Sequence, residues 1–200
     1  PAGGDFRRGA EIAAPRRLSP ADLALAAAFG VPRLTVARRP VVAVIATGDE
    51  LAMPGEAAGP DQIFAANGFG LHALLAREGA LPRLLPLAED SEAGLRQAFD
   101  LARGCDLVVT IGGASVGDHD LVAPVAQGLG ATLGFHKVAM RPGKPILAGR
   151  LPDGATLLGL PGNPVSAMVC GTVFMLPLLR AMLGLPPGPA PRRAALLATP

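Results

Sequence analysis

The stretch VVAVIATGDEL, residues 41–51, opens with a run of small and β-branched apolar residues and closes in a polar turn. An apolar run without alternation is typical of a strand that is buried on both faces of a sheet. Gly48, Asp49 and Glu50 then interrupt the apolar pattern directly after the strand. The stretch therefore predicts a central strand of a parallel sheet whose carboxyl end opens into an acidic loop.

Strand and helix patterns alternate along the chain on both sides of this stretch. Further strands are predicted at LPRLLPL (81–87), CDLVVTI (105–111), FHKVAM (135–140), PILAG (145–149) and TLLGL (156–160). Helices are predicted at 67–78, with Asn67 as N-cap, and at 91–103, 119–129 and 164–183. This alternation predicts an α/β fold, a doubly wound and mostly parallel sheet with helices on both faces in three layers.

The chain divides into three parts by composition. Residues 1–39 are expected to be the end of a preceding domain, with a helix that Ser19 caps and a short strand at 33–37. Residues 40–184 form the predicted α/β domain, and 185–200 read as a proline-rich linker entering a truncated C-terminal domain. The apolar helix at 164–183 is interrupted by proline and arginine, which favours a buried helix over a membrane span.

Composition narrows the classes of function. The 200 residues carry a net charge of +2 and contain no Trp or Tyr, which argues against nucleic-acid binding by basic runs or base stacking. Cys105 and Cys170 lack metal-ligand spacing and are expected to be buried thiols rather than a disulfide. The cysteines favour a cytoplasmic location. Nothing in the pattern indicates a membrane partner.

Three polar loops follow predicted strands, and parallel strands bring such loops to one edge of a sheet. One follows the strand at 41–47, and the second is GGASVG, residues 112–117, which leads into a helix. Its glycines let backbone amides approach an anion, although glycines at such turns also serve packing. The third is PGNPVSA, residues 161–167, in which a tight turn starts the last helix and Ser166 offers a hydroxyl. Alternatively, the turn in PGNPVSA has only a structural role and binds no ligand.

Carboxylates gather beside these loops. Asp49 and Glu50 end the first strand, and Asp118 and Asp120 follow the glycine loop. Asp118 is equally well explained as a cap that stabilises the dipole of the next helix. Carboxylates beside a phosphate site suit Mg²⁺, which is held together with the phosphates of a substrate. The sequence therefore predicts an Mg²⁺ site around Asp49, Glu50 and Asp120.

Both lysines of the chain lie in HKVAMRPGKP, residues 136–145, and the other basic residues (18 Lys+Arg minus 2 Lys, or 16) are arginine. Either the clustering is chance, or a compact ammonium group is required here, as at many phosphate sites. In a strand, Lys137 and Arg141 would share one face, and the Pro142-Gly143 turn would present Lys144. The cluster predicts a multiply charged anionic ligand.

Four motifs in order, TGDEL (47–51), GGASVGDHD (112–120), PGKP (142–145) and LPGNPVSA (160–167), resemble the molybdopterin molybdenumtransferase family, which includes MoeA and the E domain of gephyrin. The resemblance covers residues 40–184. It implies the insertion of molybdate into adenylylated molybdopterin, with Mg²⁺-dependent release of AMP, by a homodimer.

The resemblance also implies roles for individual residues. Asp49, Glu50 and Asp120 fall at positions for metal binding and catalysis, and Arg141 stands where lysine is common. The residues expected around the pterin, its phosphates or molybdate are Thr47, Gly48, Gly112, Gly113, Ser115, Gly117, Lys137, Arg141, Lys144, Pro161, Gly162, Asn163, Pro164 and Ser166.

Two departures keep other functions open. The family often has Asp-Ser/Thr-Asn before the second helix, where this chain has Ala65-Ala66-Asn67, and the upstream domain that completes the family's active site is not expected in this chain. The alternatives are a non-catalytic molybdopterin-binding module and a molybdopterin adenylyltransferase of the MogA type. The latter typically has a TGGTG loop, whereas this chain has IGGASVG.

Overall fold

A six-stranded sheet forms the centre of the computed structural model, which describes residues 6–7, 9–11, 13–113, 121–188 and 194. Across the sheet, the strands are β4 (Leu81–Leu84), β1 (Val41–Ala46), β5 (Leu107–Ile111), β8 (Thr156–Leu160), β7 (Leu147–Arg150) and β6 (Thr132–His136). The first four run parallel, and β7 runs antiparallel to both of its neighbours. The predicted mostly parallel sheet is confirmed, with an antiparallel edge.

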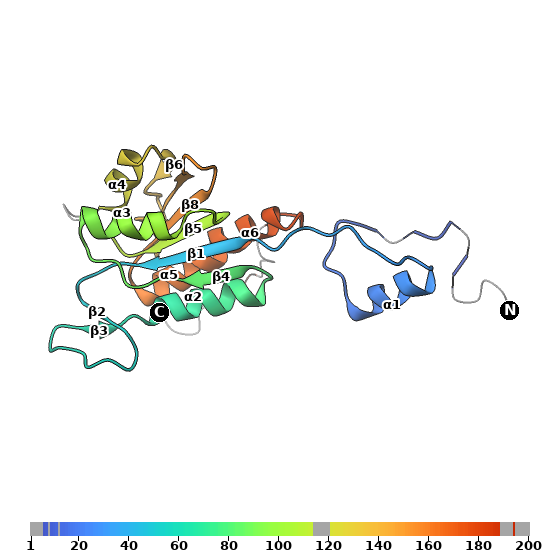
Figure 1. Ribbon diagram of the computed structural model, residues 1–200, viewed down its shortest axis with the longest axis horizontal. Helices are drawn as coiled ribbons and strands as arrows, with labels where there is room; N and C mark the ends of the chain where they lie inside the picture. The colour runs from blue at the N-terminus through green and yellow to red at the C-terminus, as the bar shows by residue number, and fades with distance from the viewer. Residues whose placement is uncertain (1–5, 8, 12, 114–120, 189–193, 195–200) are drawn as a thin grey trace.

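Helices cover both faces of the sheet (Figure 1). One apolar core packs under α3 (Glu92–Leu101) and α4 (Val122–Gly128), and the other under α2 (Ala66–Arg77) and the C-terminal helix. Alternate side chains of β1 enter the two cores, with Ile45 in the first and Val44 in the second. Because both faces of β1 are buried, its sequence is a continuous apolar run.

The C-terminal helix consists of α5 (Pro164–Cys170), a π turn over Gly171–Met175 and α6 (Leu176–Met182). Pro177 has no N–H to donate to the preceding turn, and the wider π turn comes just before it. The helix has a mean hydropathy of 1.7 and could cross a membrane by length and composition alone, and 28% of that window is buried. The prediction that this helix is buried therefore holds for only one of its faces.

An arm precedes the sheet and carries α1 (Pro20–Ala28), which lies apart from the other elements (Figure 1). Ser19 caps this helix as predicted, because its Oγ accepts the Asp22 N–H and the Asp22 carboxylate accepts the Ser19 N–H. The predicted strand at 33–37 is wrong. Residues 31–39 are exposed, and they pair with no strand in the part of the chain that the structure describes.

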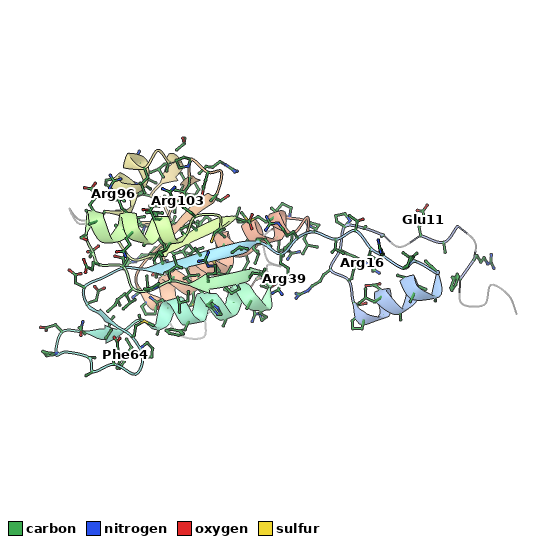
Figure 2. The ribbon with its side chains drawn as sticks, in the orientation of Figure 1. Glu11, Arg16, Arg39, Phe64, Arg96 and Arg103 are labelled. Atoms are coloured by element: carbon green, nitrogen blue, oxygen red, sulfur yellow. The ribbon has the colours of Figure 1, made fainter. Side chains whose placement is uncertain are left out.

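Two further predictions need correction. Strand β6 ends at His136, so most of the predicted strand at 135–140 is a loop, and Lys137 has a left-handed φ of 69°. The segment after β1 forms a small parallel pair, β2 (Leu51–Ala52) with β3 (Ile63–Phe64), which the sequence did not indicate. Phe64 lies on this projecting segment (Figure 2).

The prediction for the cysteines is confirmed. Cys105 and Cys170 are both buried and free. The division of the chain at residues 39 and 184 stays a prediction, as do the cytoplasmic location and the homodimer.

Candidate functional site

The loop after β1 presents the predicted acidic residues at the carboxyl edge of the parallel strands. Thr47 continues the pairing with β5, because its N–H donates to Ile111 O at 3.1 Å, and it is 2% exposed. Asp49 and Glu50 are exposed beyond it. The Oδ1 of Asp49 accepts the N–H of Asp90 at 3.2 Å, which anchors its side chain.

Asp90 is a third carboxylate at this edge and was not among the predicted site residues. It lies between β4 and α3, and its Oδ1 is 3.5 Å from the buried Thr47 hydroxyl. Its neighbour Ser91 caps α3, and an acidic residue beside a helix start is also explained by the helix dipole alone. Its place after a strand end was the signal that could have identified it.

The glycines after β5 let the loops approach one another. Gly112 and Gly113 have left-handed φ values of 87° and 60°. A Cβ on Gly112 would overlap the carbonyl oxygen of Thr47, and one on Gly113 would lie 2.8 Å from Val122 Cγ2. These contacts support a packing role for both glycines. Ser115, Gly117 and Asp120 lie outside the described residues.

The loop after β8 packs directly against the β5 loop. The N–H of Gly112 donates to Leu160 O at 3.2 Å, and a Cβ on Gly162 would lie 3.4 Å from Gly112 Cα. Asn163 caps α5, because its Oδ1 accepts the N–H and the hydroxyl of Ser166 at 3.1 and 3.2 Å. The predicted turn, with Pro161 buried and Pro164 at the first helical position, is confirmed.

The predicted capping role of Asn67 is wrong. Ala65 occupies the N-cap of α2 and makes no side-chain cap bond. Asn67 instead donates from Nδ2 to the carbonyl oxygen of Gly162 at 2.6 Å. The start of α2 therefore joins the loop after β8 at the same edge.

The loop between β6 and β7 holds the three predicted cations. Strand β7 begins opposite the end of β8, with Leu147 paired to Gly159, so this loop lies at the same edge of the sheet. Lys137, Arg141 and Lys144 are exposed, and none forms an ion pair with another described residue. The prediction that Lys137 and Arg141 share a strand face is wrong, because the strand ends before them.

Cys170 connects this cation-bearing loop to α5. A Cβ on Gly143 would lie 2.7 Å from Cys170 Sγ, so the turn that carries Lys144 packs closely on the helix. Burial raises the pKa of the Cys170 thiol, which disfavours its thiolate form. Cys170 therefore acts here as an apolar packing residue rather than as a nucleophile.

Comparison with known proteins identifies the family to which these loops belong. A family profile described as "Probable molybdopterin binding domain" matches residues 43–181. The chain belongs to this molybdopterin-binding domain family. The matched range contains all the loops at the carboxyl edge, whereas α1 and the arm lie outside it.

The relatives of this molybdopterin-binding domain include named enzymes. A "Molybdopterin molybdenumtransferase" from Nostoc sp. is 38% identical over 175 residues, which cover 86% of this chain and 40% of the relative. "Molybdopterin molybdenumtransferase 2" from Mycobacterium tuberculosis is 41% identical over 186 residues, which cover 90% of this chain and 46% of the relative. The chain thus spans less than half the length of these two relatives.

A solved structure confirms the fold. The molybdopterin biosynthesis MoeA protein from Pyrococcus horikosii is 35% identical, with a TM-score of 0.76. The similarity covers 84% of this chain and 42% of that protein.

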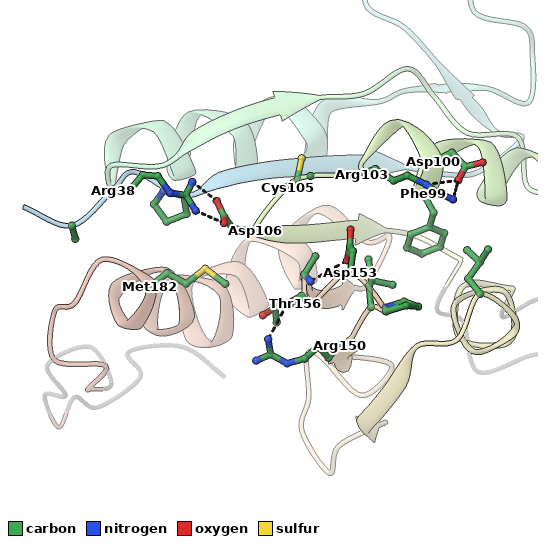
Figure 3. A pocket seen from close by; sticks show the side chains of 18 residues that line it. Arg38, Phe99, Asp100, Arg103, Cys105, Asp106, Arg150, Asp153, Thr156 and Met182 are labelled. Atoms are coloured by element: carbon green, nitrogen blue, oxygen red, sulfur yellow. Dashed lines mark hydrogen bonds and ion pairs between the residues drawn. The ribbon is translucent and has the colours of Figure 1, made fainter.

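A cavity of about 1050 Å³ lies at the opposite edge of the domain, before β1, β5 and β8 begin (Figure 3). Size alone would favour it as the site, but its charged side chains already have partners. The Arg38 guanidinium donates two hydrogen bonds to the Asp106 carboxylate, at 2.6 and 2.9 Å. These bonds hold the pKa of that carboxyl below its usual value. Arg103 pairs with Asp100. The motifs lie at the carboxyl edge, together with three cations that pair with none of the residues that the structure describes, so we place the candidate site there.

Proposed function

We propose that this chain binds adenylylated molybdopterin at the carboxyl edge of its sheet and serves in the insertion of molybdate, with Mg²⁺-dependent release of AMP. The convergence of the loops after β1, β5 and β8 carries this proposal. Their contacts, from Thr47 through Gly112 to Gly162, bring backbone and side-chain donors from distant parts of the sequence to one place. The family relationship and the names of the relatives support molybdopterin as the ligand.

The cations and the loops after β5 and β8 would hold the anionic parts of the substrate. Backbone amides at a glycine loop bind phosphate oxygens, and Ser166 adds a hydroxyl beside them. Lys137, Arg141 and Lys144 lack carboxylate partners among the described residues, which leaves their charges available to phosphate or molybdate. Ammonium groups would stabilise the negative charge that develops as AMP leaves.

The acidic residues would position Mg²⁺ against the substrate. No three His, Cys, Asp or Glu side chains among the described residues are arranged to hold a metal ion by themselves. This donor set suits Mg²⁺, which commonly uses one or two carboxylates, water and the phosphates of a substrate. Asp49 and Glu50 are exposed at the site, and Asp120 is proposed as their partner. Bound Mg²⁺ would neutralise phosphate charge during AMP release.

Release of AMP from adenylylated molybdopterin, with molybdate and Mg²⁺, tests this function directly. We expect turnover to require both ions and to fall strongly in Asp49→Asn and Asp120→Asn, while molybdopterin binding persists. Thermal unfolding of both variants should match the parent. A protein that binds no molybdopterin, or variants with full activity at limiting Mg²⁺, would contradict the proposal.

A non-catalytic molybdopterin-binding module is the second candidate. It is favoured by Ala65, which leaves the α2 N-cap without a polar side chain. In that case molybdopterin should bind, but AMP release should stay at the uncatalysed rate. The same two measurements therefore separate the candidates.

A further inference from the structure

The amide of Asn67 holds a loop that lies 95 positions later in the chain. Its Nδ2 donates to the carbonyl oxygen of Gly162 at 2.6 Å, although Asn67 itself is the second residue of α2. In the first turn of a helix, Asn commonly bonds to its own backbone. Asn67 instead reaches out of its helix, so its amide serves the loop after β8.

The start of α2 is firmly placed, which allows Asn67 to act as an anchor. The N–H of Ala65 donates to Ala52 O at 2.9 Å and joins α2 to the β2–β3 pair. A Cβ on Gly68 would lie 2.8 Å from Leu84 Cδ1, so the helix packs tightly on β4. Asn67 is half-buried between these two attachments. A side chain held in this way can transmit the position of α2 to the loop that it contacts.

The loop is confined between Asn67 and the β5 loop. On its other side, a Cβ on Gly162 would meet Gly112 Cα at 3.4 Å. The next residue, Asn163, orients Ser166 through bonds of 3.1 and 3.2 Å. Since Gly162 and Asn163 are adjacent, a shift of the Gly162 carbonyl would move Asn163 and the Ser166 hydroxyl together.

We propose that Asn67 is a positioning residue, which sets the place of Gly162, Asn163 and Ser166 for ligand binding without touching the ligand. The bond from Asn67 links α2 to the loop before α5, and Figure 1 shows both helices on the same side of the sheet. The assignment of the ligand as molybdopterin rests on the proposed function. The positioning role rests on the hydrogen bond and on the packing of α2.

Three substitutions separate the hydrogen bond from the volume of the side chain. Asn67→Leu keeps the branched shape but removes the donor, Asn67→Asp keeps the volume and places an acceptor opposite a carbonyl, and Asn67→Gln retains a donor. We expect Leu and Asp to weaken molybdopterin binding about ten-fold, the factor for one lost hydrogen bond, and Gln to recover part of it. Gln127→Leu, an exposed amide on α4, is the control and should bind like the parent.

Backbone NMR shifts and urea unfolding show whether the effect is local. In Asn67→Leu, the amides of Gly162, Asn163 and Ser166 should shift, while those of β1 and the urea midpoint stay close to the parent. Unchanged loop shifts, unchanged binding, or a binding loss that follows a loss of stability and is not recovered by Gln would overturn the inference. If the parent binds no molybdopterin, the proposed function fails, and the loop shifts without ligand still decide the role of Asn67.

Discussion

The two edges of the sheet use their polar residues in opposite ways. At the amino edge, where the cavity of about 1050 Å³ lies, Arg38 pairs with Asp106 and Arg103 with Asp100. At the carboxyl edge, the loops pack through glycines, and Lys137 and Lys144 have no ion-pair partner among the described residues. The amino edge has space and satisfied charges, whereas the carboxyl edge has close backbone contacts and cations that form no ion pair within the described part of the chain.

The difference shows that an empty volume and a binding site are separate properties. A charge that is already paired must lose its partner before it can bind a ligand, so a cavity lined by ion pairs offers little net attraction. Exposed cations without partners attract an anion at no such cost. Arg39, which lies where the arm meets the domain (Figure 2), follows the amino-edge pattern, since it donates to the carbonyls of Gly79 and Ala80.

The largest loss of stability is expected for a substitution of Gly112 at the carboxyl edge, compared with Gly154 at the amino edge. Gly112 and Gly154 both have left-handed φ values, 87° and 90°, but a Cβ on Gly154 would meet nothing within 4 Å. Gly154→Ala should cost about 1–2 kcal/mol through its backbone conformation alone. Gly112→Ala should cost several kcal/mol, more than about 3, because the Cβ would also displace the Thr47 carbonyl. Urea unfolding measures both, and equal losses would remove the steric argument.

The next effect concerns binding rather than stability. Lys144→Ala should weaken molybdopterin binding by about 1.5–3 kcal/mol, the range for a hydrogen bond to a charged group. Lys144→Arg should cost about 1–2 kcal/mol, because a planar guanidinium directs its donors differently. Arg150, whose Nη1 donates to Gly154 O at 2.8 Å at the amino edge, is the control. Arg150→Ala should bind like the parent, and wild-type binding by Lys144→Arg would make the lysine clustering a matter of chance.

A smaller effect with a distinct pH dependence is expected at Asp106. Its pKa lies below the usual value because Arg38 donates to it, so its contribution to stability is present above pH 4 and is lost as pH falls through the folded-state pKa. Asp106→Asn should lower the free energy of unfolding at neutral pH by up to about 1 kcal/mol, since Arg38 is largely exposed. At strongly acidic pH the variant and the parent should converge. Urea midpoints across this range test the prediction, and a constant difference would contradict it.

The smallest effect is expected for Arg103→Gln. Its partner Asp100 lies three residues away on an exposed helix end, and both side chains are more than half exposed. Removing this pair should change stability by less than about 0.5 kcal/mol and leave binding unchanged. A clear loss of molybdopterin affinity would assign a ligand role to the amino-edge cavity and reverse the comparison of the edges.

Local sequence patterns were sufficient for much of the fold and for part of the site. The apolar run at 41–46 predicted a strand buried on both faces, and β1 confirms it because a central strand meets a helix layer on each side. Ser19 and Asn163 were predicted to begin helices or lie in tight turns, and both form caps through bonds to residues three positions later. Such signals are readable because the interacting groups are neighbours in the chain.

Local patterns gave wrong predictions for residues whose structure depends on contacts with distant parts of the sequence. A β-like run at 33–37 formed no strand because none of the described strands lies beside it, and Lys137 left the strand pattern when β6 ended at His136. Pairing requires a partner, and the partner is set by tertiary structure.

By itself, the sequence determined the alternation of strands and helices that builds the main sheet and its two helix layers, the buried character of β1 and the polar loops at one edge, because periodicity and caps depend on nearby residues. Only the tertiary structure decided that Asp90 anchors Asp49 and that Asn67 holds Gly162 rather than capping its own helix. These pairs lie 41 and 95 positions apart. Their contacts exist because parallel strands bring distant loops to a common edge, and no local pattern specifies which side chains then meet.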